Sequence, residues 1–270
     1  MNKDEIIENA KVDGFLLQKT QRPDGPGAEG CWFGGKPTLP EDIEWPWTKK
    51  AYQQPSIPLH FIAQLKLDSV PWHDGLPEMP RTGTLFFFAD TLFGPAEDYR
   101  HDSVKIFHVT EDVSGVLERS MPAGFPDVEK LPFKSHGYEF GRKAEYKKWN
   151  FEFVPRIAFN WWKCEDYVDS TEGLAQAVTK VLFEEEDRLE AMSDFQHSMF
   201  AGPHPRHPDE KVEPYTWTTE KLPLLGLMDD DDLGFWVSIC DYGLVFNVAK
   251  DQLKDGIFEP AFAMPTNVMA

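Results

Sequence analysis

Cysteine is scarce in this chain: Cys31, Cys164 and Cys240 are the only three among 270 residues, and no two of them form a C-x-x-C pair. An odd number of widely separated cysteines argues against a disulfide framework and against a zinc site built from thiolates. The same pattern is typical of proteins that work in a reducing compartment.

Long apolar runs are also missing. The first residues, MNKDEIIENAKVDGF, are charged and contain no apolar core of signal-peptide length. No other stretch approaches the roughly 20 apolar residues that a membrane-spanning helix needs. The sequence therefore predicts a cytoplasmic protein that does not bind to a membrane.

Positive charge is the third scarcity. The chain has 27 Lys and Arg against 46 Asp and Glu, which leaves a net charge of −19. Such a chain repels nucleic acid, whose binding requires Lys and Arg to displace counterions, and it repels anionic membrane surfaces. It attracts a basic partner, although acidity can also serve solubility alone.

Apolar side chains are abundant, at 41 % of the chain with 14 % aromatic, so a folded core is expected. Four segments have the composition of β-strands: they are apolar and β-branched or aromatic, and two of them alternate. They are residues 58–67 (PLHFIAQLKL), 82–90 (TGTLFFFAD), 104–110 (VKIFHVT) and 150–162 (NFEFVPRIAFNWW).

Two segments have helical spacing. Residues 3–11 place Ile6, Ile7 and Ala10 on one face, and Gly14 ends or interrupts this helix. A longer helix starts at the N-cap residue Ser170 and continues as far as Phe200, because apolar residues recur at helical intervals. The region from about residue 114 to residue 148 is polar, contains Pro and Gly, and has no assignment.

Three features of the first half recur in the second half. Residues 33–37 (FGGKP) resemble 200–205 (FAGPHP), residues 58–68 resemble 222–229, and residues 82–92 resemble 242–253. We interpret this internal similarity as a degenerate tandem duplication.

The predicted fold is α+β: predominantly antiparallel β-sheets from an internal duplication, with a long helix between the repeats. The chain is one domain, 1–270, with repeat one at about 30–110, a connecting region at about 111–199 and repeat two at about 200–270.

Several of these blocks also resemble a known family. They are residues 33–40 (FGGKPTLP), 45–46 (WP), 58–65 (PLHFIAQL), 83–88 (GTLFFF), 224–232 and 241–253. Together they resemble the YwqG-like bacterial proteins, a domain without an assigned biochemical function. Two departures lie in the second half, where the family usually has a Gln near Leu227 and a WGD-like turn at residues 240–243. The resemblance implies a mostly antiparallel β fold with an internal repeat. It also implies, from gene neighbourhoods that carry polymorphic toxins, that some members are immunity proteins.

The stretch from Trp32 to Trp47 contains Gly34 and Gly35 among prolines and tryptophans. Adjacent glycines can let backbone N–H groups approach an anion. They can equally supply unusual backbone angles at a corner that the prolines stiffen and the tryptophans bury. The run is not a GxxxxGK[ST] loop, so we favour a structural corner.

Gln64 lies in the first strand of repeat one and is a possible ligand contact, in a cleft with Gly34 and Gly35.

The only group of residues that resembles a metal site is His197, His204 and His207 with Asp209 and Glu210. Prolines surround it, so a solvated loop is the better interpretation, and we expect no metal and no cofactor. GxSxG and HExxH motifs are absent, and we assign no catalytic residue.

Two acidic runs are candidate contacts for a partner. They are Asp229, Asp230, Asp231 and Asp232 between two strands, and Glu184, Glu185, Glu186 and Asp187 on the long helix. The preferred function is a non-enzymatic binding protein, an immunity-type protein that neutralises a cognate toxin, such as a nuclease, through an acidic surface. The alternative is a small-molecule binder or enzyme with a site between the two repeats near Gln64. A scaffold without either activity is the third hypothesis.

Overall fold

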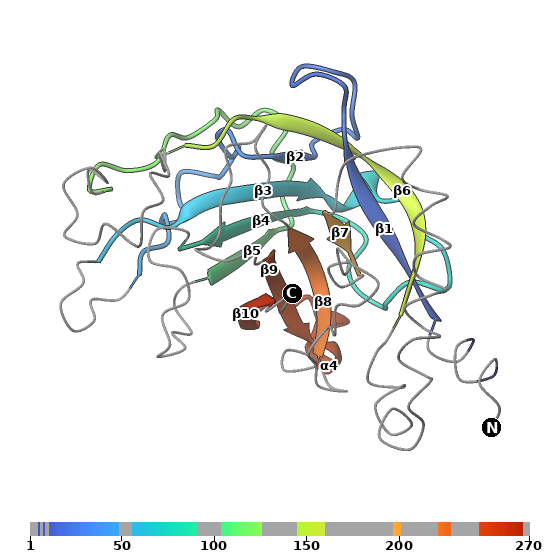
Figure 1. Ribbon diagram of the computed structural model, residues 1–270. Helices are drawn as coiled ribbons and strands as arrows, with labels where there is room; N and C mark the ends of the chain where they lie inside the picture. Colours follow the sequence, from blue (N-terminus) through green and yellow to red (C-terminus); the bar gives the residue numbers. More distant parts are fainter. Residues whose placement is uncertain are drawn as a thin grey trace, which may run out of the picture.

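The computed structural model describes residues 11–48, 56–90, 104–125, 145–159, 197–200, 221–227 and 243–266, together with Glu5 and Glu8. These residues form a ten-stranded antiparallel sheet with the order β10-β9-β8-β7-β1-β6-β2-β3-β4-β5 (Figure 1). The strands are β1 (Lys11–Lys19), β2 (Trp32–Phe33), β3 (His60–Lys66), β4 (Thr84–Ala89), β5 (Val104–Val109), β6 (Trp149–Phe159), β7 (Ser198–Met199), β8 (Lys221–Leu227), β9 (Gly243–Ala249) and β10 (Pro260–Thr266).

The sheet is nearly closed and barrel-like. Its two outermost strands, β5 and β10, lie against each other, and in Figure 1 the strands β8, β9 and β10 curl beneath β3, β4 and β5. Phe87 of β4 meets Phe246 of β9 across the interior, with ring centroids 5.1 Å apart. His108 of β5 contacts Phe258 just before β10, at 5.0 Å. The main apolar core therefore fills the inside of the curved sheet.

The continuous apolar run of β4 follows from burial on both of its faces. Leu85 and Phe87 join the main core inside the sheet, whereas Phe86 and Phe88 join a second apolar cluster on the outside. Trp45 belongs to that outer cluster. A strand that is covered on both sides does not alternate between apolar and polar residues.

The sheet has the same strand pattern on either side of the central pair β1–β6. A two-residue strand comes first on each side, β2 or β7, and a seven-residue strand comes next, β3 or β8. The register against the next strand shifts at corresponding places, between Phe61 and Ala63 and between Pro223 and Leu225. The duplication inferred from the sequence stays a prediction, and this matched order is a geometrical property of the sheet.

The predicted fold class is wrong. Within the described residues the fold is nearly all antiparallel β rather than α+β. Apart from Glu5 and Glu8, which are helical, the helical elements there are α4 (Lys250–Leu253) and the 3-10 turn η1 (Leu67–Ser69), of one turn each. The long helix does not reach Phe200, because Ser198 and Met199 form β7 and pair with both β1 and β8. Residues 170–196 of the predicted helix lie outside the described residues.

The four predicted strand segments are confirmed as β3, β4, β5 and β6. The sequence does not predict strand β1: it predicts that Gly14 ends or interrupts a helix, whereas Gly14 lies within the strand. Among the helices of the described chain, none is both long and apolar enough to cross a membrane.

Candidate functional site

The glycine corner directly follows β2. Gly34 and Gly35 have φ angles of +57° and +66°, which side chains of L-residues rarely adopt. A Cβ atom on Gly34 would lie 2.4 Å from the carbonyl oxygen of Lys147. The N–H of Gly34 donates to the Ile62 carbonyl and that of Gly35 to the Tyr146 carbonyl, both at 2.8 Å. Both amides therefore join the corner to β3 and to the residues that precede β6.

The proline-rich segment after the corner covers the outside of the sheet. Leu39 and Trp45 are buried in the outer cluster, and the indole N–H of Trp45 donates to the Leu59 carbonyl at 2.9 Å. The ring of Trp45 contacts Phe88 edge to face, with centroids 5.1 Å apart. The segment thus supplies the apolar surface that buries the outward side of β4.

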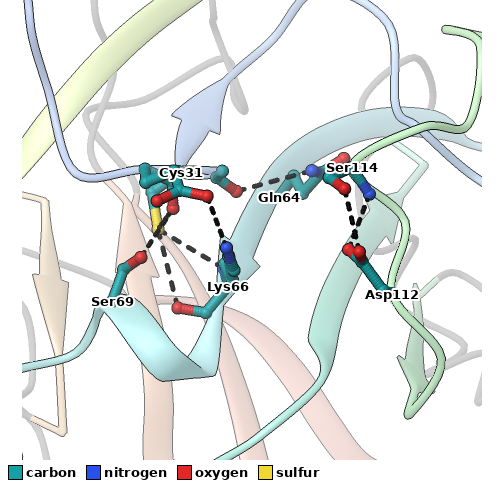
Figure 2. Close-up of polar contacts among 8 residues, drawn as sticks. Cys31, Gln64, Lys66, Ser69, Asp112 and Ser114 are labelled. Carbon is teal, nitrogen blue, oxygen red and sulfur yellow. Dashed lines mark hydrogen bonds and ion pairs between the residues drawn. The ribbon is translucent and has the colours of Figure 1, made fainter.

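Gln64 is buried on β3 and bonded on both ends of its amide. Its Oε1 accepts from the N–H and the hydroxyl of Thr38, each at 3.0 Å. Its Nε2 donates to the Gly30 carbonyl at 3.4 Å, and Figure 2 shows this bond. Gln64 therefore links β3 to the chain on both sides of β2. The ligand-cleft role expected for Gln64, Gly34 and Gly35 stays a prediction.

The Cys31 thiol lies close to Gln64 and is unreactive as a nucleophile. Burial raises its pKa to about 12, because the thiolate would lose its hydration. The thiol lies 3.8 Å from the Lys66 carbonyl and 3.6 Å from that of Glu29 (Figure 2). A thiol that stays protonated at neutral pH is a poor nucleophile.

Carboxylates gather around the Lys66 ammonium on the surface beside Cys31. Lys66 Nζ donates to Glu29 Oε1 at 2.6 Å, and this bond raises the pKa of Lys66. Asp68 and Asp112 add weaker attraction of the same sign. Asp112 accepts from the N–H and the hydroxyl of Ser114, each at 2.9 Å, and these bonds lower the pKa of Asp112 (Figure 2). The two bonds from Ser114 to Asp112 close a local turn in the loop after β5.

No group of three or more His, Cys, Asp or Glu side chains is placed to hold a metal ion in the part of the chain that the structure describes. His197 is buried, with its ring centroid 4.7 Å from that of Phe33. The other members of the predicted group, His204, His207, Asp209 and Glu210, lie outside the described residues.

Both predicted partner-binding runs also lie outside the described residues. They are Asp229, Asp230, Asp231 and Asp232, which follow β8, and Glu184, Glu185, Glu186 and Asp187.

Sequence reasoning missed the role of Arg119, which lies in the region that had no assignment. The N–H of Arg119 donates to the Pro37 carbonyl at 2.9 Å. Its guanidinium Nη1 donates to the carbonyls of Pro40 and Ile43, at 2.7 and 2.8 Å. The only sequence signal for this role of Arg119 is a single cation in an acidic loop. The groups that accept its hydrogen bonds are backbone carbonyls, which have no sequence signature.

Lysines and tryptophans meet where β2 pairs with β6. Lys148 Nζ lies 3.9 Å from the centre of the Trp32 ring and pairs with Glu118 at 2.6 Å. Lys19 and Lys147 place their ammonium groups 4.7 and 4.6 Å from the ring centre of Trp149. Cation–π contacts of this kind stabilise exposed sites by about 0.5–1 kcal/mol, so they strengthen this junction of the sheet.

One family model matches most of the chain. It is described as "Domain of unknown function (DUF1963)" and covers residues 32–264. No curated protein matches the chain.

Proposed function

Because the chain belongs to the DUF1963 family, a domain of unknown function, its role has to be inferred from its own residues, and we propose that it is a non-enzymatic binding protein. Its partner in this proposal is a cognate bacterial toxin with a basic surface. The chain acts in the cytoplasm as an immunity-type protein, and the finer assignment to the YwqG-like proteins is part of the same proposal.

The observation that supports this proposal is the sign of the exposed charge. Exposed basic side chains are few within the described residues: Arg22, Arg81, Lys147, Lys250 and Lys254. Exposed acidic side chains are far more numerous: Glu5, Glu8, Asp24, Glu29, Glu41, Asp42, Glu44, Asp68, Asp74, Glu78, Glu111, Asp112, Glu118, Glu152, Asp251, Asp255 and Glu259. Within the described residues, exposed carboxylates therefore outnumber exposed cations by 17 to 5, which is the same sign as the net charge of −19 of the whole chain.

Such a surface selects its partner by charge. It accelerates the encounter with a basic protein and disfavours acidic competitors. If the toxin is a nuclease, its substrate channel carries Lys and Arg for phosphate binding, and carboxylates can occupy that channel in place of phosphates. Neutralisation then requires no chemical step.

The test is co-expression of this chain with the products of the genes next to its own, to find a neighbouring toxin, with growth of the host as the readout. We expect restored growth and a stable complex of the purified proteins. Screening weakens attraction between exposed charges, so the Kd of the complex should rise at least about tenfold between about 50 mM and 500 mM salt. The absence of both rescue and complex at low salt would refute the proposal.

A second set of variants locates the contact. Reversal of Asp229, Asp230, Asp231 and Asp232 to Lys should abolish neutralisation if this run binds the toxin. Unchanged binding would exclude this acidic run as the contact and would leave the immunity role in place.

A further inference from the structure

Two segments that are far apart in the sequence form one continuous surface on the outside of the sheet. They are residues 37–48 and residues 113–125, and we call them together the Arg119 surface. Arg119 joins them through its three hydrogen bonds to the carbonyls of Pro37, Pro40 and Ile43.

The Arg119 surface has a buried apolar base. Leu39, Trp45 and Val113 are buried in the outer cluster, and Ile43 and Met121 pack against that cluster from the same two segments. A surface that is already ordered loses little conformational entropy when a partner binds.

Two large apolar side chains of the same segments are exposed. Leu117 is 84 % exposed and Trp47 is 37 % exposed. The Trp47 ring lies against Gly124, where a Cβ atom would approach its Cη2 to 2.9 Å. Ile257, at 45 %, is the third large apolar side chain that is exposed within the described residues, and it lies after α4, away from these two segments in the sequence. Exposed apolar patches mark protein interaction sites, and tryptophan is among the residues that are enriched at the energetic centres of interfaces.

The charge of the Arg119 surface is negative. Glu41, Asp42 and Glu44 are exposed between the buried residues Leu39 and Trp45. Ile43 donates its N–H to the Pro40 carbonyl at 3.2 Å, so Glu41 and Asp42 occupy the centre of a turn. Exposed apolar side chains together with carboxylates on the same pair of segments are complementary to a protein surface with apolar side chains among Lys and Arg.

We propose that the Arg119 surface is a docking site for a basic protein, with Leu117 and Trp47 as its apolar anchors and Glu41, Asp42 and Glu44 as its charged rim. This inference rests on the proposed function and adds a second contact region to the acidic run after β8.

The first test uses a labelled peptide of repeated Lys-Lys-Leu, whose binding to the full chain is followed by fluorescence anisotropy. Leu117→Ser should weaken binding about tenfold, because burial of one leucine contributes at least the 1.4 kcal/mol that corresponds to a factor of ten. The matched control Ile257→Ser should change the Kd less than twofold. Leu117 is mostly exposed, so a circular dichroism melt should show unchanged folding.

The second test separates a site from general attraction. The triple variant Glu41→Lys, Asp42→Lys, Glu44→Lys and the control triple Asp251→Lys, Asp255→Lys, Glu259→Lys change the net charge equally. We expect at least tenfold weaker peptide binding for the first triple and less than threefold for the control. Equal weakening by both triples, or no effect of Leu117→Ser, overturns the inference.

The same variants are then tested against the neighbouring toxin. If the toxin binds, and Leu117→Ser and the first triple bind it as tightly as their controls do, the Arg119 surface is refuted as a docking site and the proposed function stands. If no toxin binds but the peptide distinguishes the variants from their controls, the proposed function fails and the Arg119 surface remains supported as a basic-protein site.

Discussion

At the scale of single residues, Gly34 and Phe200 occupy corresponding positions in the sheet and have similar φ angles, although their side chains differ. Gly34 follows β2 with φ +57°, and Phe200 follows β7 with φ +60°. Each donates its N–H to the neighbouring seven-residue strand, Gly34 to Ile62 at 2.8 Å and Phe200 to Leu224 at 3.4 Å. The internal sequence similarity matches Phe200 with Phe33, but the strand register matches Met199 with Phe33. Phe200 therefore adopts an angle that disfavours a side chain by about 1–2 kcal/mol.

Gly34→Ala should destabilise the protein strongly. The new Cβ would lie 2.4 Å from the Lys147 carbonyl oxygen, in addition to the unfavourable φ angle. We expect a loss of more than about 2 kcal/mol in the free energy of unfolding, measured by urea denaturation. Gly115→Ala is the control, because nothing lies within 4 Å of its Cβ position, and it should change stability by less than about 0.5 kcal/mol. Similar losses for both variants would contradict this account of the corner.

At the scale of elements, chain segments without regular structure decide how the outer cluster is closed. Strands β3, β4 and β5 supply one side of that cluster, and residues 37–48 and 113–125 cover it. Neither covering segment is held by a strand ladder, apart from the single bridge between Trp47 and Pro58. Arg119 therefore carries much of the polar connection between the two segments.

Arg119→Met should loosen both covering segments together. Methionine retains apolar contact but leaves the carbonyls of Pro40 and Ile43 without the guanidinium donor. We expect a loss of about 1–3 kcal/mol in the free energy of unfolding. Hydrogen exchange should become faster in residues 37–48 as well as in residues 113–125. Arg22→Met is the control, because Arg22 is mostly exposed and its ion pair with Asp24 has a separation of 3.7 Å. Faster exchange confined to residues 113–125 would refute a joint role.

At the scale of the whole molecule, the nearly closed sheet must fold against its own charge. A net charge of −19 opposes compaction through self-repulsion. Salt screens this repulsion over a Debye length of about 10 Å at 0.1 M. The folded state should therefore gain stability from moderate salt while its attraction to basic partners falls.

The melting temperature should rise when NaCl is increased from about 20 mM to 300 mM. A gain of about 1 kcal/mol corresponds to a shift of about 2–4 °C for a domain of this size. The triple Asp251→Lys, Asp255→Lys, Glu259→Lys changes the net charge from −19 to −13, so its shift should be smaller. Differential scanning calorimetry measures both proteins, and a Tm that falls with salt in the original chain would contradict the prediction.

The sequence alone determined the strands whose composition is strongly apolar, because local preference and burial agree in β3, β4, β5 and β6. It also determined the net charge and the unusual backbone of the glycine corner. Tertiary structure decided what local patterns leave ambiguous: Gly14 lies within β1 and Ser198–Met199 form β7, because pairing with distant strands outweighs local helical spacing. It also decided the Arg119 surface, since backbone carbonyls are present at every residue and only the folded chain selects the three that Arg119 contacts.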